Sequence, residues 1–211
     1  MNAASEWSQL LAFLRLVGKL KQLRRKGWID RGVREPESVA DHSFRLALLA
    51  WLIGQSVGGA DPARMALLAL VHDMPEALAG DRTPFDDALA AGADRTALFR
   101  QPPPRDAAAT AAKSHAERAA LHEMTAVLPP SLAEALQSLW EEYETGATLE
   151  AQLVRQLDKL ETALQALEYH ETQPELVIDS FVLGLDDAVV HPALRDIAAA
   201  LQATWKAGST S

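Results

Sequence analysis

Four residues have types and spacing that could hold one metal ion: His42, the adjacent pair His72 and Asp73, and Asp158. Neutral imidazoles and carboxylates are the ligands that borderline and hard divalent metals share. The chain contains 0 cysteines, which excludes thiolate zinc sites, disulfides and a cysteine nucleophile. We therefore predict one divalent metal bound through nitrogen and oxygen, as in many hydrolases. The residue types do not choose among cobalt, manganese, magnesium, zinc and iron.

Helical phase predicts that both histidines face the core. His42 continues the apolar line of Leu46 and Leu49, and His72 shares a helix face with Leu68. Burying several ionisable groups near one another costs several kcal/mol unless they are paired or bind a metal. A shared metal would resolve that cost for the two histidines and the two aspartates together.

Glu76 follows the histidine and aspartate pair by one helical turn, so on an ideal helix its carboxylate would overhang them. This position predicts general acid/base work on a water at the metal. Glu161, one turn after Asp158, is predicted to accept a hydrogen bond from a ligand or to pair with a cation.

The elements that must position these residues are all helices, because apolar residues recur every three or four positions and no alternating strand pattern stands out. Ser38 and Asp61-Pro62 are predicted helix starts, and Pro75 predicts a kink or restart. Helices are expected at about 7–23, 39–54, 113–127, 132–143, 149–169 and from His191-Pro192 to near Trp205. Residues 86–112 lack a clean apolar period and are predicted to form a loop, a flexible excursion or a lid.

Composition and charge limit the class of protein. With 211 residues, 48% of them hydrophobic, a single domain is expected over 1–211, with its core at about 28–191. The net charge of -9 argues against binding of duplex nucleic acid. A small anionic substrate would need local cations, which Arg31 and Arg34 offer before the His42 helix. The basic segment 19–26 is interpreted as a solvated helix end.

The first residues lack a signal-peptide pattern, and the longest apolar stretch, 46–53, is too short to span a membrane. A cytoplasmic protein without membrane contact is expected.

An ordered series of motifs resembles the HD-domain phosphohydrolases, and within them the 5′-deoxynucleotidase branch. The resemblance covers about 28–191. It rests on Arg31, Pro36-Glu37-Ser38-Val39-Ala40-Asp41-His42, Leu70-Val71-His72-Asp73-Met74-Pro75-Glu76, Gly80-Asp81, Leu139-Trp140-Glu141-Glu142-Tyr143-Glu144 and Gln156-Leu157-Asp158.

This resemblance implies a compact all-α HD-domain bundle, usually a homodimer, that hydrolyses nucleoside 5′-monophosphates with one divalent metal. It implies that His42, His72, Asp73 and Asp158 are metal ligands and Glu76 is the catalytic carboxylate. It also implies that Arg31 binds phosphate, that Asp81 lies near the sugar and attacking water, and that Thr83 is a weaker candidate for substrate contact.

One departure affects the expected sugar preference. The bacterial enzymes have a tryptophan directly after the phosphate-binding arginine, thought to screen out ribose, whereas this chain has Gly32. Selectivity for deoxyribose is therefore left open.

Three alternatives also stay open. Triphosphates or alarmone nucleotides become candidate substrates if Arg100, Arg105 or Lys113 folds over the site. A di-iron oxygenase would use extra histidines such as His115 and His122, although their spacing is typical of surface positions. A non-catalytic HD module would not require Glu76 or a phosphate-binding arginine.

Overall fold

The protein is described by a computed structural model that covers the backbone of residues 3–208 and the side chains of 6–207. Residues 1 and 2 lie outside the described part of the chain, and they belong to the N-terminal stretch that lacks a signal-peptide pattern. Within the described part the chain is helical, apart from one isolated antiparallel bridge between Arg24 and Ser38. The prediction of an all-α fold is confirmed.

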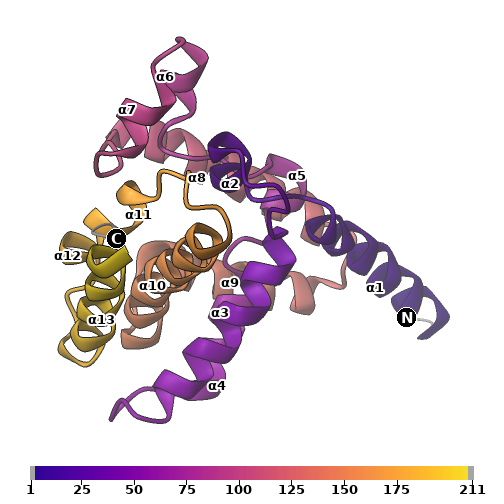
Figure 1. Ribbon diagram of the computed structural model, residues 1–211. Helices are drawn as coiled ribbons and strands as arrows, with labels where there is room; N and C mark the ends of the chain where they lie inside the picture. Colours follow the sequence, from indigo (N-terminus) through magenta and orange to yellow (C-terminus); the bar gives the residue numbers. More distant parts are fainter. Residues whose placement is uncertain (1–2, 209–211) are drawn as a thin grey trace.

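The helices, with the labels used in Figure 1, follow one another along the chain without any intervening sheet. Their bounds are α1 Ala3–Val17, η1 Gly18–Lys21 (a 3-10 helix), α2 Lys26–Arg31, α3 Val39–Gly54, α4 Pro62–Val71, α5 Glu76–Ala79, α6 Asp86–Ala90, α7 Arg95–Phe99, α8 Ala107–Thr125, α9 Pro130–Thr145, α10 Leu149–Thr172, α11 Asp179–Leu183, α12 Leu185–Ala188 and α13 Pro192–Gly208.

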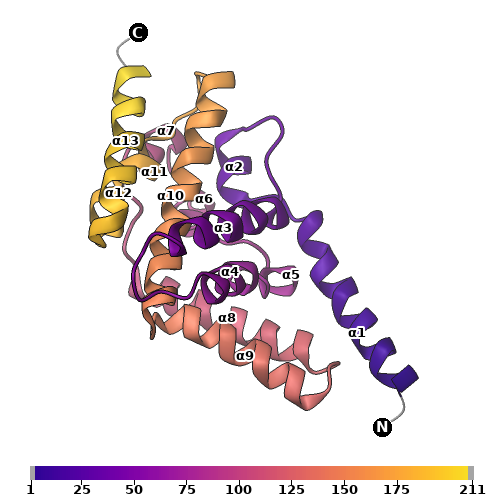
Figure 2. The same cartoon turned by 90° about the horizontal axis from the view of Figure 1, so that it is seen from below.

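The centre of the bundle is α10, which packs against α3, α4, α9 and α13. Seen from below, α3 and α4 lie against one another while α1 projects to one side (Figure 2). The inward stripe of α10, including Leu153, Leu157 and Leu160, is fully buried in the main core cluster. This stripe fixes the rotation of α10, so Asp158 and Glu161 face α3.

Two predicted helix starts are confirmed. Ser38 caps α3 in a capping box with Asp41: the Ser38 hydroxyl accepts from the Asp41 amide, and the Asp41 carboxylate accepts from the Ser38 amide. Asp61 caps α4 ahead of Pro62. The predicted restart at Pro75 is also present, since α4 ends at Val71 and α5 begins at Glu76.

The segment 86–112 differs from the predicted loop. It contains α6, α7 and the first residues of α8, whose N-cap is Asp106. Phe85 and Phe99 are buried and pack edge to face, 5.3 Å apart, so two aromatic residues give this alanine-rich segment a small core of its own. In Figure 1 α6 and α7 form the upper end of the molecule. Movement of the segment as a lid stays a prediction.

None of the helices described has the length and apolar character needed to cross a membrane.

Candidate metal centre

The start of α3 brings His42 into the bundle. The capping box fixes the first turn, and the imidazole of His42 is fully buried. His42 Nδ1 lies 2.5 Å from Glu161 Oε2 on α10, and Arg45 Nε donates to the other oxygen of Glu161 at 2.6 Å. A hydrogen bond from Nδ1 leaves Nε2 free for a metal. Glu161 therefore occupies the supporting position predicted for it.

The histidine and aspartate pair lies in the turn between α4 and α5. Here Glu76 donates its amide to the carbonyl of Asp73, three residues back, so the turn is tighter than an α-helix. Trp140 Nε1 donates to the carbonyl of His72 at 3.0 Å, which anchors the turn to α9. Pro75, which has no amide hydrogen, accounts for the tightening.

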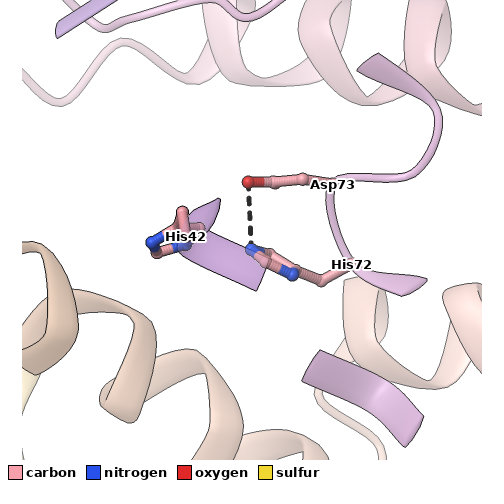
Figure 3. A group of neighbouring side chains, drawn as sticks. All are labelled: His42, His72 and Asp73. Carbon is pink, nitrogen blue, oxygen red and sulfur yellow. Dashed lines mark ion pairs between the residues drawn. The ribbon is translucent and has the colours of Figure 1, made fainter. Parts of the chain in front are cut away.

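Three of the four predicted ligands form one group, and the fourth, Asp158, lies beside His42. One ligand atom from each of His42, His72 and Asp73 lies within 4.8 Å of the others, and their side chains face a common space in Figure 3. His72 Nε2 is 3.0 Å from Asp73 Oδ2. Asp158 Oδ1 lies 3.1 Å from His42 Nε2. All four residues are buried.

Three polar atoms at this centre lack the partners that buried groups normally have. Among the described residues, His42 Nε2, His72 Nε2 and Glu76 Oε2 are the buried side-chain atoms without a hydrogen bond. Both nitrogens approach a carboxylate oxygen, but in a geometry that forms no hydrogen bond. Free imidazole nitrogens that converge with carboxylates fit a divalent metal of the borderline or hard class.

The acidic groups at the centre have different electrostatic environments. Burial would raise the pKa of Asp73, but His72 and Arg25 outweigh it, and the net pKa is far below the usual range. Asp158 is likewise lowered despite burial, by Lys159 and His42. Burial, Asp73 and Asp81 instead raise the pKa of Glu76 well above its usual value. Two carboxylates are thus kept ionised, while Glu76 can hold a proton.

The arginine beside the metal ligands is Arg25, not Arg31. Arg25 Nη1 donates to Asp73 Oδ2 at 2.8 Å, just before α2. The bridge of Arg24 to Ser38, with the Arg25 amide donating to the Glu37 carbonyl, holds this segment against the start of α3. Burial would lower the pKa of Arg25, but the charges of Asp73, Asp81, Asp158 and Glu76 outweigh it and raise the pKa above its usual value.

Arg31, which the resemblance implied as the phosphate ligand, faces elsewhere. Its guanidinium donates to the Gly27 and Val177 carbonyls and to Ser180 Oγ, between the rings of Phe99 and Phe181. Each of its three nitrogens donates one hydrogen bond, and the assignment of Arg31 to phosphate stays a prediction. Gly32 caps α2 with φ 80°, a left-handed conformation that favours glycine, and the doubt over ribose no longer depends on it.

Asp81 and Thr83 lie at the edge of this group. Asp81 Oδ2 accepts from the Lys26 amide at 2.6 Å, and its charge acts on both Arg25 and Glu76. The Thr83 hydroxyl donates to Asp86 Oδ1 at 2.6 Å, so its donor is already used at the start of α6.

Comparison with known proteins gives the family. A family model described as HD domain matches residues 17–193, a range that contains the expected core at 28–191. The chain belongs to the HD-domain family. Its histidine and aspartate pair, from which the family takes its name, is His72-Asp73.

Curated HD-domain relatives extend over most of this chain. The 5′-deoxynucleotidase HDDC2 of Bos taurus is 38% identical over 92% of this chain and 84% of its own length. That of Homo sapiens is 41% identical over 78% of this chain and 70% of its own. A solved structure of a conserved hypothetical protein from Pyrococcus furiosus superposes with TM-score 0.67 at 30% identity, over 91% of this chain and 98% of that one.

Other predicted residues of this HD-domain chain divide into two groups. Lys113, on α8, reaches the centre: its Nζ lies 3.5 Å from Glu76 Oε1. Arg105 instead pairs with Asp187 on the surface. His115 and His122 are exposed, and no potential metal-binding group among the described residues includes either one. The structure therefore offers no geometric support for the di-iron alternative.

Sequence reasoning missed Arg25. Its only signal was membership of the basic segment 19–26, interpreted as a solvated helix end. Arg24 and Arg25 cannot be told apart by type, and only the bridge to Ser38 turns one inward.

Proposed function

We propose that this HD-domain chain is a metal-dependent 5′-deoxynucleotidase that removes the 5′-phosphate from deoxyribonucleoside monophosphates. The observation that carries the proposal is the burial of His42, His72, Asp73 and Asp158 around free imidazole nitrogens, beside an acid/base candidate and an arginine. The curated relatives bear the name of this activity.

His42, His72, Asp73 and Asp158 would hold one divalent ion. Such an ion, when bound, lowers the pKa of a water and offsets negative charge on a phosphoryl group. The four side chains do not choose its identity, so cobalt, manganese, magnesium, zinc and iron are all to be tested.

Arg25 binds the substrate phosphate in this proposal. Its guanidinium is partly buried, is held by Asp73, and offers further donors in a fixed fork that suits phosphate oxygens. Arg25 thus both orients Asp73 and supplies the local positive charge that an anionic substrate requires in a chain of net charge -9.

Glu76 transfers the proton. Its raised pKa, its burial and its free Oε2 suit a carboxyl group that accepts a proton from the attacking water and returns it to the leaving 5′-oxygen. Asp81 is proposed to orient the water or the sugar. Thr83 has a smaller role, since its hydroxyl donates to Asp86.

A substrate with one phosphate fits the cations better than a polyphosphate. Arg25 is the cation assigned to phosphate and Lys113 is held by Glu76 and Glu117, whereas Arg105 lies on the surface with Asp187 and Arg100 is exposed. Monophosphates are therefore favoured over triphosphates and alarmone nucleotides.

We also propose a homodimer that uses the outer face of α3 and α4. This α3–α4 face consists of the exposed apolar residues Phe44, Leu48, Trp51, Leu52, Leu67 and Leu70. Soluble monomers rarely expose contiguous apolar patches of this kind. Because α3 also carries His42, dimerisation would stiffen the helix that supplies a ligand.

Phosphate release tests the function. The metal-free chain is loaded in turn with each candidate ion and given paired ribonucleoside and deoxyribonucleoside monophosphates, with triphosphates for comparison. Metal-dependent release from deoxyribonucleoside monophosphates is expected, with kcat falling about 100-fold in Glu76→Gln, the usual range for loss of a general acid/base. Glu123→Gln, an exposed glutamate of α8, is the matched control.

The proposal fails if no metal supports release from any monophosphate. The role of Glu76 fails if Glu76→Gln keeps the turnover of the control.

A further inference from the structure

Lys113 occupies an unusual place for a lysine on an amphipathic helix. Its ammonium lies 3.5 Å from Glu76 Oε1 and 3.3 Å from Glu117 Oε1, so it stands between two carboxylates. Glu76 belongs to α5 and the other two residues to α8, and these helices pack against one another. A residue outside the ligand set thus connects α8 to the acid/base candidate.

Glu117 is placed to hold Lys113. It lies one turn further along α8, and its carboxylate is largely buried beneath the lysine stem. Burial raises the pKa of Glu117 and Lys113 lowers it, which indicates that the lysine is the principal cation near this carboxylate. Burial of a glutamate without such a cation would be costly.

The two oxygens of Glu76 have different environments. Oε1 faces Lys113, whereas Oε2 is buried and has no hydrogen bond. A carboxylate held through one oxygen presents the other in a fixed direction. Arg25 approaches the ligand carboxylate of Asp73, so Lys113 is the cation in contact with the acid/base candidate itself.

We propose that Lys113 is a positioning residue for the hydrolytic reaction: tethered by Glu117, it fixes Oε1 of Glu76 so that Oε2 faces the reacting water. It acts through Glu76 and does not itself bind the substrate phosphate. This inference rests on the proposed role of Glu76.

The test compares Lys113→Met with Arg118→Met. Both side chains lie on α8, are 37% and 39% exposed, and form one or more ion pairs, but Arg118 pairs with Glu141 away from Glu76. Lys113→Arg and Glu117→Gln complete the set. For each variant, kcat, KM, inhibition by inorganic phosphate, metal content and melting temperature are measured on the metal-loaded chain.

We expect kcat of Lys113→Met to fall about 10- to 100-fold, the range for loss of a residue that supports a catalytic group. The KM and the phosphate inhibition constant should stay within about twofold, since the phosphate would be bound by other groups. Lys113→Arg should recover most of kcat. The kcat of Glu117→Gln should lie between those of Lys113→Arg and Lys113→Met. Arg118→Met should match the wild type.

Three results would overturn the inference. One is an unchanged kcat in Lys113→Met. Another is that weaker inhibition by inorganic phosphate accounts for the whole loss of activity in Lys113→Met, which would make Lys113 a phosphate ligand. The third is an equal loss in Arg118→Met. If Lys113→Met does not fold, the other two variants decide. The inference is then overturned if Glu117→Gln has the kcat of the wild type, or if Lys113→Arg does not retain activity. An inactive wild type instead overturns the proposed function.

Discussion

One carboxylate oxygen of Asp73 lies close to nitrogen atoms of two different residues. His72 Nε2 lies at 3.0 Å and Arg25 Nη1 at 2.8 Å from Oδ2. His72 and Arg25 together keep the pKa of this carboxyl group low despite its burial, and the carboxylate in turn orients the guanidinium. The proposed metal ligand Asp73 and the proposed phosphate ligand Arg25 are therefore coupled through one atom.

Replacement of Arg25 tests this coupling. We expect Arg25→Met to reduce kcat/KM by about 100-fold, since a charged donor to the transition state is lost, and to weaken inhibition by inorganic phosphate. Arg24→Met is the control, because Arg24 is half exposed and donates to the Pro36 carbonyl. Equal losses in both variants, measured by steady-state phosphate release, would contradict the assignment.

Glu161 determines which nitrogen of His42 faces the ligands. Glu161→Gln should weaken metal affinity about 10- to 100-fold, since a neutral amide holds the ring less firmly. Calorimetric titration of the metal-free chain measures this. Glu168→Gln is the comparison, because Glu168 accepts from the same Arg45 but lies on the surface. An unchanged affinity in Glu161→Gln would show that the ring is oriented by packing alone.

At the residue scale, helix periodicity in the sequence predicted that the candidate ligands face the core, but it did not single out Arg25. His42 and Asp158 lie on helices whose apolar stripes fix their direction, and His72 directly follows the last residue of α4, so periodicity was enough to turn them inward. Arg25 lies between helices, where its direction depends on a bridge of two segments that no periodicity encodes. Arg31 resembled a loop arginine, yet it is the last residue of α2.

At the scale of elements, Arg31 fastens α7 to the body of the protein. Its guanidinium lies 3.9 Å from the Phe99 ring centre on α7 and 4.1 Å from that of Phe181 on α11. Burial lowers its pKa to about 10, only partly offset by Asp30, so it remains charged at neutral pH. The Arg31 guanidinium lies between two rings and donates hydrogen bonds to two carbonyls. It thus holds α2, α7 and α11 together, although it forms no ion pair with a carboxylate of the described residues.

Loss of this contact should loosen the segment from α6 to α7. We expect Arg31→Met to lower the free energy of unfolding by about 1–3 kcal/mol, because buried carbonyls lose their donors. Amide exchange should increase over 86–99 while 149–172 stays protected. Arg100→Met, at an exposed site at the end of α7, is the control. Unchanged exchange in Arg31→Met would mean that the aromatic pair alone holds the segment.

The expectation of a loop at 86–112 was wrong for a related reason. Each helix there is too short for a repeating apolar pattern, and Phe85 and Phe99 are separated by a stretch rich in alanine and aspartate. The partner that gives the two rings their place is Arg31, more than fifty residues earlier in the chain. Helices 39–54 and from Pro62 were predictable because their caps are local.

At the scale of the whole molecule, the α3–α4 face predicts the oligomeric state. Phe44 is the most exposed residue of this face at 70%, so Phe44→Glu should convert a dimer into monomers. Light scattering coupled to size-exclusion chromatography measures the mass. Val190→Glu, an exposed apolar position outside this face, should leave the mass unchanged. A wild-type mass near 22.9 kDa would contradict the proposed dimer.

The tightened turn before α5 also affects how the protein acquires its ion. Its shape follows from Pro75 and from the Trp140 donor to the His72 carbonyl, neither of which is a contact to the ion. We therefore expect the backbone of the turn to keep its shape when the ion enters or leaves. Binding energy is then available for affinity rather than for ordering the chain, and exchange between different ions should be fast and leave the helical circular dichroism unaltered.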